Sequence, residues 1–213
     1  MPKLQCQQDL DASLGRLAER DPRLARYIAT CSPVDLRQRP AGLAGLLQII
    51  LAQQVSVASA RAIWQKFETR FPGCDVDRLA AASEADLRAC SLSSPKIKAV
   101  LRITQAIHEG FDLDGLALCE ASEIKKALVA LHGVGPWTAD IYLLFCLGER
   151  DVFPSGDLAL QIAVQQALAM VSRPSDKVLA AMAQELWAPE RGAAAHLFWA
   201  IYRDIKSWRE GVL

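Results

Sequence analysis

Hydrophobic residues recur every three or four positions along most of the chain, which places them on one face of a helix. No segment alternates between apolar and polar residues for long enough to predict a strand. We therefore expect an all-α fold. The predicted helices, with approximate ends, span Gln8–Arg20, Pro22–Thr30, Gly42–Gln53, Val57–Arg70, Asp77–Ala82, Glu84–Ala89, Pro95–Glu109, Ser122–Leu131, Pro136–Leu147, Leu158–Met170, Asp176–Trp187 and Glu190–Trp208.

Residues typical of helix starts precede several of these segments. Ser56, Ser83 and Ser122 stand where a hydroxyl can accept a backbone N–H from the first turn. The segment from Pro33 to Pro40, which includes Arg37, is the expected connector between an N-terminal helical pair and the main body.

The charge balance excludes a protein that binds nucleic acid by bulk charge. Of 213 residues, 52% are hydrophobic, and 24 Lys plus Arg balance 24 Asp plus Glu. Such a chain can bury a core, as one large domain or as two lobes. Local basic groups remain, and we interpret each one first as a solvated helix face. They are Arg61, Lys66 and Arg70, then Lys96, Lys98 and Arg102, then Lys125 and Lys126.

The cysteines and histidines show no metal-binding spacing. The six cysteines are scattered and include no Cys-x-x-Cys pair, which is typical of reduced thiols in a cytosolic protein. We see no signal peptide, and no apolar run reaches the roughly 20 residues that a membrane span needs. His108, His132 and His196 are isolated, so we expect no zinc or iron–sulfur site.

The stretch Leu131–Asp140 predicts a tight turn between two helices. Gly133 and Gly135 permit a turn that other residues resist, and Pro136 suits the first position of the second helix. Backbone N–H groups at such a turn, and at the N-terminus of the helix after it, attract anions such as phosphate. The ligand class indicated is a phosphodiester. Asp140 is interpreted as a surface or capping carboxylate.

A second motif, Phe153–Asp157, supplies a carboxylate. The second hairpin helix is about 18 Å long, and the connection from Gly148 to Gly156 can span about 30 Å, so the chain can return Asp157 to the hairpin. An aspartate directly before a helix is also an ordinary N-cap that needs no function. Taken alone, capping is the better interpretation, whereas together with the hairpin a catalytic role is favoured.

In order and spacing, these motifs resemble the helix-hairpin-helix (HhH-GPD) DNA glycosylases. The segments Ile50–Ser56 and Trp187–Arg191 complete the likeness, which runs from about residue 40 to residue 205. The alkylation-repair branch, DNA-3-methyladenine glycosylase II, is the most similar. The resemblance implies two helical lobes with a cleft between them. We place one lobe at about 1–45 plus 158–213 and the other at about 46–157, with the hairpin at 124–147.

The resemblance also implies roles for single residues. Asp157 matches the family's catalytic aspartate. Trp137 stands where bifunctional relatives carry a lysine, so the Schiff-base route is closed and the enzyme is expected to be monofunctional. Trp137 and Trp199 match positions that line the base pocket, and Tyr142 and Phe198 are weaker candidates. The remaining tryptophans, Trp64, Trp187 and Trp208, are interpreted as core residues.

Contacts to DNA follow in the same way. A flipped nucleotide leaves a gap in the duplex, and Gln53 and Gln54 match the region that fills it, although both also suit an exposed helix end. His132 departs from the proline usual at its position and adds a candidate phosphate contact. The resemblance suggests a monovalent cation at the hairpin carbonyls. The expected backbone contacts are His132, Gly133, Val134, Gly135 and Thr138.

The sequence as a whole predicts a monofunctional DNA glycosylase that excises alkylated purines of the 3-methyladenine type. Its expected partner is double-stranded DNA with damaged bases, it needs no organic cofactor, and it acts as a monomer in the bacterial nucleoid or the nucleus. Two alternatives stay open. One keeps the fold and acts on uracil, deaminated or oxidised bases, and the other is a non-catalytic module that only binds DNA.

Overall fold

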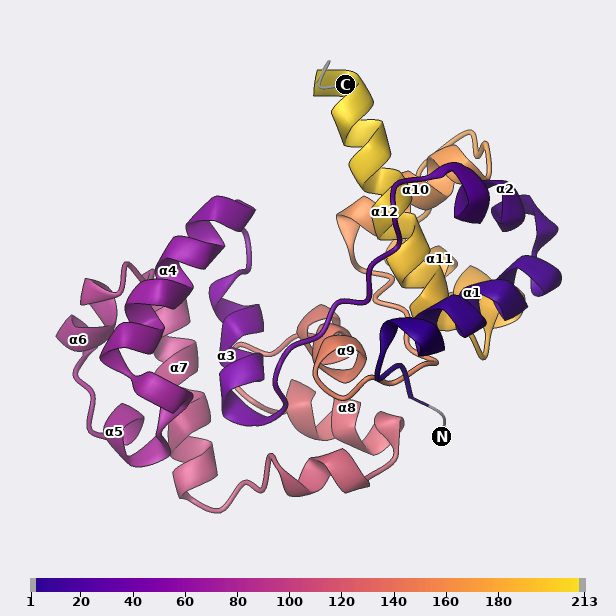
Figure 1. The fold of residues 1–213 in the computed structure, drawn as a ribbon. Coiled ribbons are helices and arrows are strands. Elements are labelled where there is room, and N and C mark those ends of the chain that lie inside the picture. The colour runs from indigo at the N-terminus through magenta and orange to yellow at the C-terminus, as the bar shows by residue number, and fades with distance from the viewer. Residues whose placement is uncertain (1–2, 211–213) are drawn as a thin grey trace. The chain divides into compact units, whose positions relative to one another are not determined.

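The computed structural model describes residues 3–210, with side chains for residues 3–207. This part of the chain consists of helices joined by turns and extended segments, which confirms the all-α prediction (Figure 1). An isolated antiparallel bridge joins Lys3 to Glu149. Within the described range, no helix is long and apolar enough to cross a membrane.

The chain divides into two compact units. Unit 1 combines Met1–Gln38 with Gly148–Leu213, and unit 2 is Arg39–Leu147. The sequence-based boundaries near residues 45 and 157 differ from these for local reasons. The Arg39 N–H donates to the Phe145 carbonyl at 2.9 Å inside unit 2, and the Leu4 N–H donates to the Gly148 carbonyl at 2.7 Å inside unit 1. Asp157 therefore belongs to unit 1, and the hairpin belongs to unit 2.

Unit 1 is built around its last helix. Helices α1, α2, α10 and α11 all pack against α12 (Figure 1). Ala193, Ala194 and Ala195 are fully buried, and their small side chains let the neighbouring helices approach α12 closely. The helices of unit 1 are α1 (Gln7–Arg20), α2 (Pro22–Thr30), α10 (Leu158–Ala167), α11 (Asp176–Trp187) and α12 (Arg191–Glu210).

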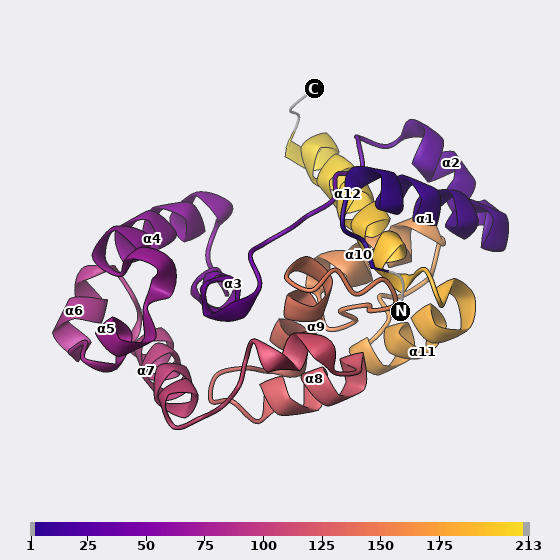
Figure 2. The same cartoon turned by 60° about the horizontal axis from the view of Figure 1, so that its bottom comes forward.

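Unit 2 contains the hairpin and a second group of helices. Helix α3 contacts α4, α7 and α9, and α8 packs against α9 (Figure 2). A core that includes Leu47, Phe67, Leu87 and Val100 holds the first part of the unit together. The helices of unit 2 are α3 (Gly42–Leu51), α4 (Val57–Arg70), α5 (Val76–Ala80), α6 (Glu84–Ala89), α7 (Ser94–His108), α8 (Ala121–Val129) and α9 (Pro136–Phe145), with short 3-10 turns η1 (Pro72–Cys74) and η2 (Gly115–Leu118).

Two of the three predicted serine caps are confirmed. Ser56 accepts the Ser59 N–H at 3.1 Å, and Ser83 accepts the Asp86 N–H at 3.2 Å. The prediction of Ser122 as a cap is wrong. The Glu120 carbonyl already accepts the Ile124 N–H, and the helix starts before the serine.

The core tryptophans agree with their interpretation where the structure describes them. Trp187 is fully buried, and the half-buried Trp64 stacks on Phe67 with ring centroids 5.7 Å apart. The side chain of Trp208 lies outside the described residues.

Candidate active site

The hairpin of unit 2 joins α8 to α9 through a turn held by two buried side chains. Leu131 and Val134 point into the unit, and the Val134 N–H donates to the Leu131 carbonyl at 3.2 Å. Gly133 has a φ of 84°, a left-handed conformation that favours glycine. A Cβ at Gly133 would stand 2.6 Å from the Cβ of Ala99. Both backbone freedom and space therefore require glycine at this position.

The tip of the hairpin presents its backbone to solvent. His132, Gly133, Gly135 and Pro136 are exposed, whereas the side chain of Val134 is buried. Gly135 is the N-cap of α9, with extended backbone angles, and a Cβ there would meet no atom within 4 Å. The first N–H groups of a helix have no partner within the helix, and they attract anions. The geometry at Gly135 therefore leaves room for a phosphate to approach the start of α9.

An ion pair ties the two hairpin helices together. The Lys125 ammonium lies 2.6 Å from the Asp140 carboxylate, whose side chain is only 9% exposed. The interpretation of Asp140 as a surface or capping residue is therefore wrong. Lys125 reaches from α8 to α9, so its charge is used inside the protein.

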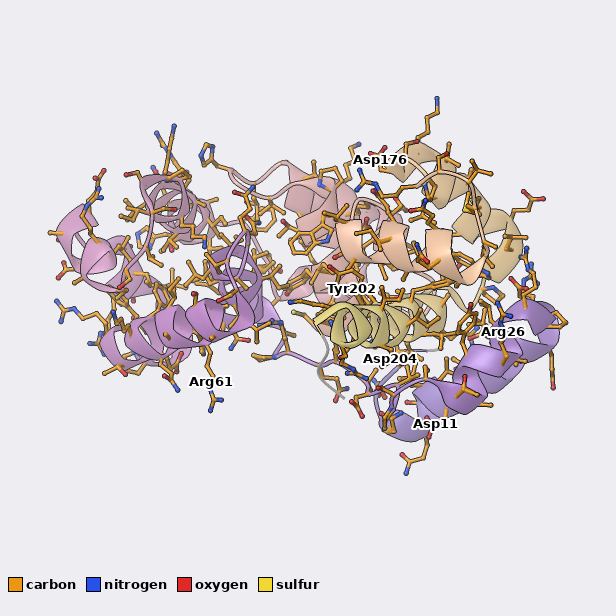
Figure 3. All side chains as sticks on the ribbon, turned by 90° about the horizontal axis from the view of Figure 1, so that it is seen from above. Asp11, Arg26, Arg61, Asp176, Tyr202 and Asp204 are labelled. Atoms are coloured by element: carbon orange, nitrogen blue, oxygen red, sulfur yellow. The ribbon has the colours of Figure 1, made fainter. Side chains whose placement is uncertain are left out.

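Other basic groups of unit 2 also have partners within the protein. Arg70 pairs with Asp86 at 2.6 Å, and the Lys96 ammonium donates to the Leu51 carbonyl at 2.8 Å at the end of α3. Burial lowers the pKa of Lys96. Arg61, in contrast, projects from the surface of α4 (Figure 3). Arg61 therefore agrees with the interpretation as a solvated helix face, whereas Arg70, Lys96 and Lys125 bond to partners within unit 2.

The turn between α3 and α4 separates the two candidate wedge residues. Gln53 is half-buried, and its amide donates to the Thr138 hydroxyl at 2.9 Å. Gln54 is exposed and has a φ of 55°. Thr138 is 2% exposed, so its side chain faces Gln53 and the protein interior rather than solvent. Gln54 is the better placed of the two glutamines to reach into DNA.

The structure does not support Tyr142 or Phe198 as walls of a base pocket. Tyr142 is 1% exposed, and its phenol oxygen accepts the Gly42 N–H at 2.9 Å. Burial raises the pKa of Tyr142 to about 12. Phe198 is fully buried, with its ring 4.8 Å from Trp187 between centroids. Both side chains are core residues of their units. Trp137, in the first turn of α9, is half-buried and remains a candidate.

The candidate carboxylate of unit 1 is the N-cap of α10. Its Oδ1 atom accepts the Ala159 N–H at 2.9 Å and the Leu160 N–H at 3.2 Å. A turn fixes the approach, because the Asp157 N–H donates to the Pro154 carbonyl at 2.9 Å. Phe153, just before this turn, is buried against Trp187. Asp157 itself is half-buried, so a rigid turn holds a carboxylate that still has access to solvent.

Trp199 lies on α12 in the same unit and is covered by other side chains. It is 6% exposed, the His196 ring meets it edge-on at 5.8 Å, and the guanidinium carbon of Arg37 lies 5.0 Å from its ring centroid. Arg37 belongs to the predicted connector, and its place beside Trp199 was not expected. Periodicity gives no signal for a contact between an extended segment and a distant helix.

The predicted site residues thus fall into two sets. Asp157 and Trp199 belong to unit 1, and the hairpin, Trp137 and the two glutamines belong to unit 2. Within residues 3–207, no group of three or more His, Cys, Asp or Glu side chains is placed to hold a metal ion.

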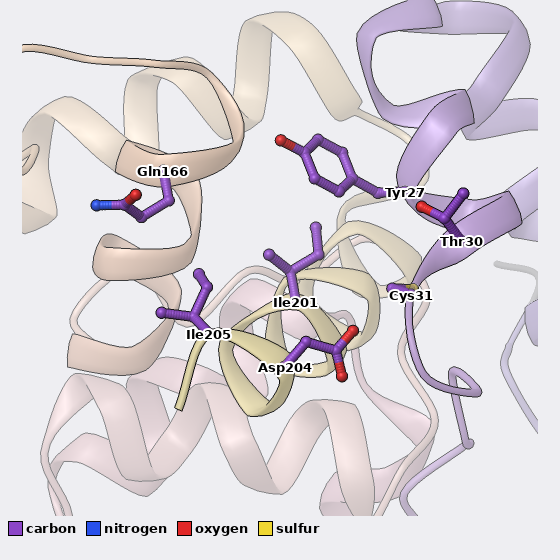
Figure 4. Close-up of a pocket in the computed structure, with 7 residues that line it drawn as sticks. All are labelled: Tyr27, Thr30, Cys31, Gln166, Ile201, Asp204 and Ile205. Atoms are coloured by element: carbon purple, nitrogen blue, oxygen red, sulfur yellow. The ribbon is translucent and has the colours of Figure 1, made fainter. Parts of the chain in front are cut away.

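Unit 1 also contains a cavity of about 480 Å³ between α2, α10 and α12 (Figure 4). Tyr27, Gln166, Ile201 and Asp204 are among the residues that line it. The Asp204 carboxylate accepts the Ser32 N–H at 2.9 Å at its edge. None of the residues that line the cavity belongs to the predicted site, so we treat the cavity as separate from it.

Comparisons with known proteins support the resemblance that the hairpin and the Asp157 motif indicated. The model of the HhH-GPD superfamily of base excision DNA repair proteins matches residues 47–189. YfjP of Bacillus subtilis, which bears the name of a DNA-3-methyladenine glycosylase, is 28% identical over 72% of this chain, which spans 56% of that protein. DNA-3-methyladenine glycosylase 1 of Schizosaccharomyces pombe is 25% identical over 87% of this chain and 83% of its own. The crystal structure of DNA-3-methyladenine glycosidase from Bacillus halodurans is similar, with a TM-score of 0.78 and 26% identity over 92% of this chain and 91% of that chain.

Proposed function

Because the chain belongs to the HhH-GPD superfamily of base excision DNA repair proteins, we propose that it is a DNA glycosylase that hydrolyses the N-glycosidic bond of alkylated purines of the 3-methyladenine type. The names of its relatives in Bacillus subtilis and Schizosaccharomyces pombe support this substrate class. The observation that carries the proposal is the half-buried Asp157, which a turn and a helix N-terminus hold in one orientation.

Asp157 supplies the chemistry that such a reaction needs. The bond between sugar and base breaks through a state with positive charge on the sugar, and a carboxylate beside the sugar stabilises that charge. The same group can orient the attacking water or accept its proton. Both N-cap bonds end on Oδ1, and they fix the orientation of the carboxylate.

The leaving base determines which other residues are needed. An alkylated purine that already carries a positive charge leaves without a second acid. Indole faces attract such a cation, which gives Trp137 and Trp199 their proposed place as pocket walls. Trp137 has no amine, so no Schiff base forms there, and the product is an abasic site rather than a cut strand.

The hairpin and the α3–α4 turn act on the DNA itself. The exposed backbone of Gly133 and Gly135 binds a phosphate, with His132 beside it. Val134 takes part only through its backbone, because its side chain is buried. Gln54 fills the gap that the flipped nucleotide leaves, and Gln53 holds the turn through Thr138. We expect the enzyme to act as a monomer on double-stranded DNA, in the bacterial nucleoid or the nucleus.

Replacing Asp157 with asparagine tests the proposal. The asparagine side chain keeps an oxygen that can accept both N-cap bonds, so the free energy of unfolding and the affinity for DNA stay close to those of the parent. The rate of base release from methylated duplex falls by about 100- to 1000-fold, the cost of losing one charge-stabilising group. Single-turnover release of free bases, identified by chromatography, measures this.

Asp176→Asn is the matched control, because Asp176 is an exposed carboxylate in the first turn of α11 (Figure 3). Its release rate stays at the parent level. If Asp157→Asn releases methylated purines as fast as the parent, the catalytic assignment is wrong. If the parent releases only uracil, deaminated or oxidised bases, the fold acts on another substrate. If it binds DNA and releases no base, the chain is a binding module.

A further inference from the structure

In unit 1, the side chain of Arg37 lies over the ring of Trp199. The guanidinium carbon lies over the indole ring at 5.0 Å from its centroid, a cation–π pair. The arginine is exposed, whereas the tryptophan beneath it is 6% exposed. A charged side chain therefore covers an aromatic surface that is otherwise shielded from water.

A buried histidine fixes the backbone of Arg37 beside this ring. The Nε2 atom of His196 accepts the Arg37 N–H at 3.3 Å, and Nδ1 lies 2.8 Å from the Gly192 carbonyl. These contacts require a neutral ring with its proton on Nδ1, and burial lowers the pKa of His196 to about 4. His196 and Trp199 are three residues apart on α12 and so share a face of the helix. The anchor acts on the backbone of residue 37, so it does not depend on the arginine side chain.

The guanidinium and a cationic purine have the same attraction to an indole face. Both carry delocalised positive charge on a flat group, so they compete for Trp199, and they repel each other when close together. A neutral purine stacks on the ring without that repulsion. The rate of release of cationic bases relative to that of neutral bases therefore depends on the charge at residue 37.

We propose that Arg37 is a specificity-determining residue that weakens the preference of the enzyme for cationic bases relative to neutral ones, by occupying the face of Trp199. This inference rests on the proposed function, and in particular on Trp199 as a wall of the base pocket. Arg37 does not touch the sugar in this account and has no catalytic role.

The test compares two lesions in the same duplex sequence, cationic 7-methylguanine and neutral 1,N6-ethenoadenine. Arg37→Met keeps the length of the side chain and removes its charge. We expect the ratio of kcat/KM for the cationic base to kcat/KM for the neutral base to rise by about 2- to 5-fold, the range that an exposed cation–π pair represents. Arg37→Lys keeps the charge, and its ratio stays close to that of the parent.

Arg26→Met is the matched control. Arg26 forms a similar pair with Tyr27 in the same unit, with its guanidinium carbon 4.6 Å from the ring centroid. Loss of this charge changes the general attraction to phosphate, which affects both substrates equally and leaves the ratio unchanged. A purely structural role of Arg37 would likewise lower both rates together.

The two failures can be told apart. If the parent releases both bases and Arg37→Met leaves the ratio unchanged or lowers it, the role of Arg37 is refuted and the proposed function stands. If the parent releases no base from any damaged duplex, the proposed function fails, and the role of Arg37 fails with it. An equal rise of the ratio in Arg26→Met would also refute the inference, because it would reflect total charge.

Discussion

Replacing Gly133 with alanine should destabilise the protein through two separate effects in the hairpin. The φ of 84° places a non-glycine residue in the left-handed region, at a cost of about 1–2 kcal/mol. The new Cβ would also stand 2.6 Å from the Cβ of Ala99, which is 2% exposed on α7. That neighbour is a methyl group attached directly to a helix backbone and cannot rotate away. Overpacking of this kind costs about 1–3 kcal/mol.

The two contributions predict a loss of about 2–5 kcal/mol in the free energy of unfolding. Urea unfolding of the parent and the variant, followed by circular dichroism, measures this loss. A second substitution separates its parts. Ala99→Gly removes the methyl group that clashes, at a cost of about 1 kcal/mol for glycine inside a helix. A double-mutant cycle of the two changes should then give a favourable coupling of about 1–3 kcal/mol.

Gly135→Ala is the control, two residues along the same turn. Its φ of −89° suits any residue, and a Cβ there meets no atom within 4 Å. It should cost no more than about 1 kcal/mol, through the poorer N-cap. It should instead weaken binding to duplexes of every sequence, because the new methyl group stands where a phosphate approaches. Equal losses of stability at Gly133 and Gly135, or no coupling with Ala99, would refute this account of the hairpin.

Two further predictions concern the α3–α4 turn and the buried histidine. Gln54→Ala should slow base release from paired lesions more than from unpaired ones, and it should leave the free energy of unfolding unchanged. Gln53→Ala should lower the free energy of unfolding by about 1 kcal/mol, because the bond to Thr138 is lost. Equal effects of the two substitutions on both measurements would contradict this division of roles. The folded pKa of His196, about 4, lies below its ordinary value of 6.5, so the unfolded chain binds the proton first and stability falls as the pH drops from 6.5 towards 4. When the pH falls from 7 to 4.5, the free energy of unfolding measured in urea should drop by about 2–3 kcal/mol more for the parent than for His196→Gln. Parallel pH profiles of the two proteins would show that the histidine is not the cause.

Much of the fold could be predicted from the sequence because most helices are amphipathic and have clear ends. Helix α4, for example, begins after the predicted cap Ser56 and buries Phe67 on one face. The hairpin was also predictable, since Gly133 and Pro136 have conformational preferences that few other arrangements satisfy. The start of α8 was missed because backbone bonds from Glu120 begin the helix before Ser122, and no side chain marks that point.

The residues that were placed less well lie mainly on α9. Every residue from Thr138 to Phe145 is buried, so this helix has no polar face. Periodicity identifies a helix of this kind but cannot say which way a single polar side chain points. Thr138, Asp140 and Tyr142 therefore looked accessible in the sequence, whereas each of them bonds to a partner inside unit 2. The pair of Arg37 and Trp199 was missed for another reason, because it joins an irregular segment to a helix far along the chain.

The two interpretations of Asp157 that the sequence left open do not exclude each other. As an N-cap, the residue needs only an oxygen that accepts N–H groups, and Oδ1 provides it. As a catalyst, it needs negative charge near the sugar, which an amide lacks. Capping also assists catalysis, because an orientation fixed before the substrate arrives does not have to be created during the reaction. Asparagine would keep both N-cap bonds and would lose only the attraction between a negative charge and the N-terminus of α10, about 0.3–1 kcal/mol. The reaction, in contrast, depends on that charge.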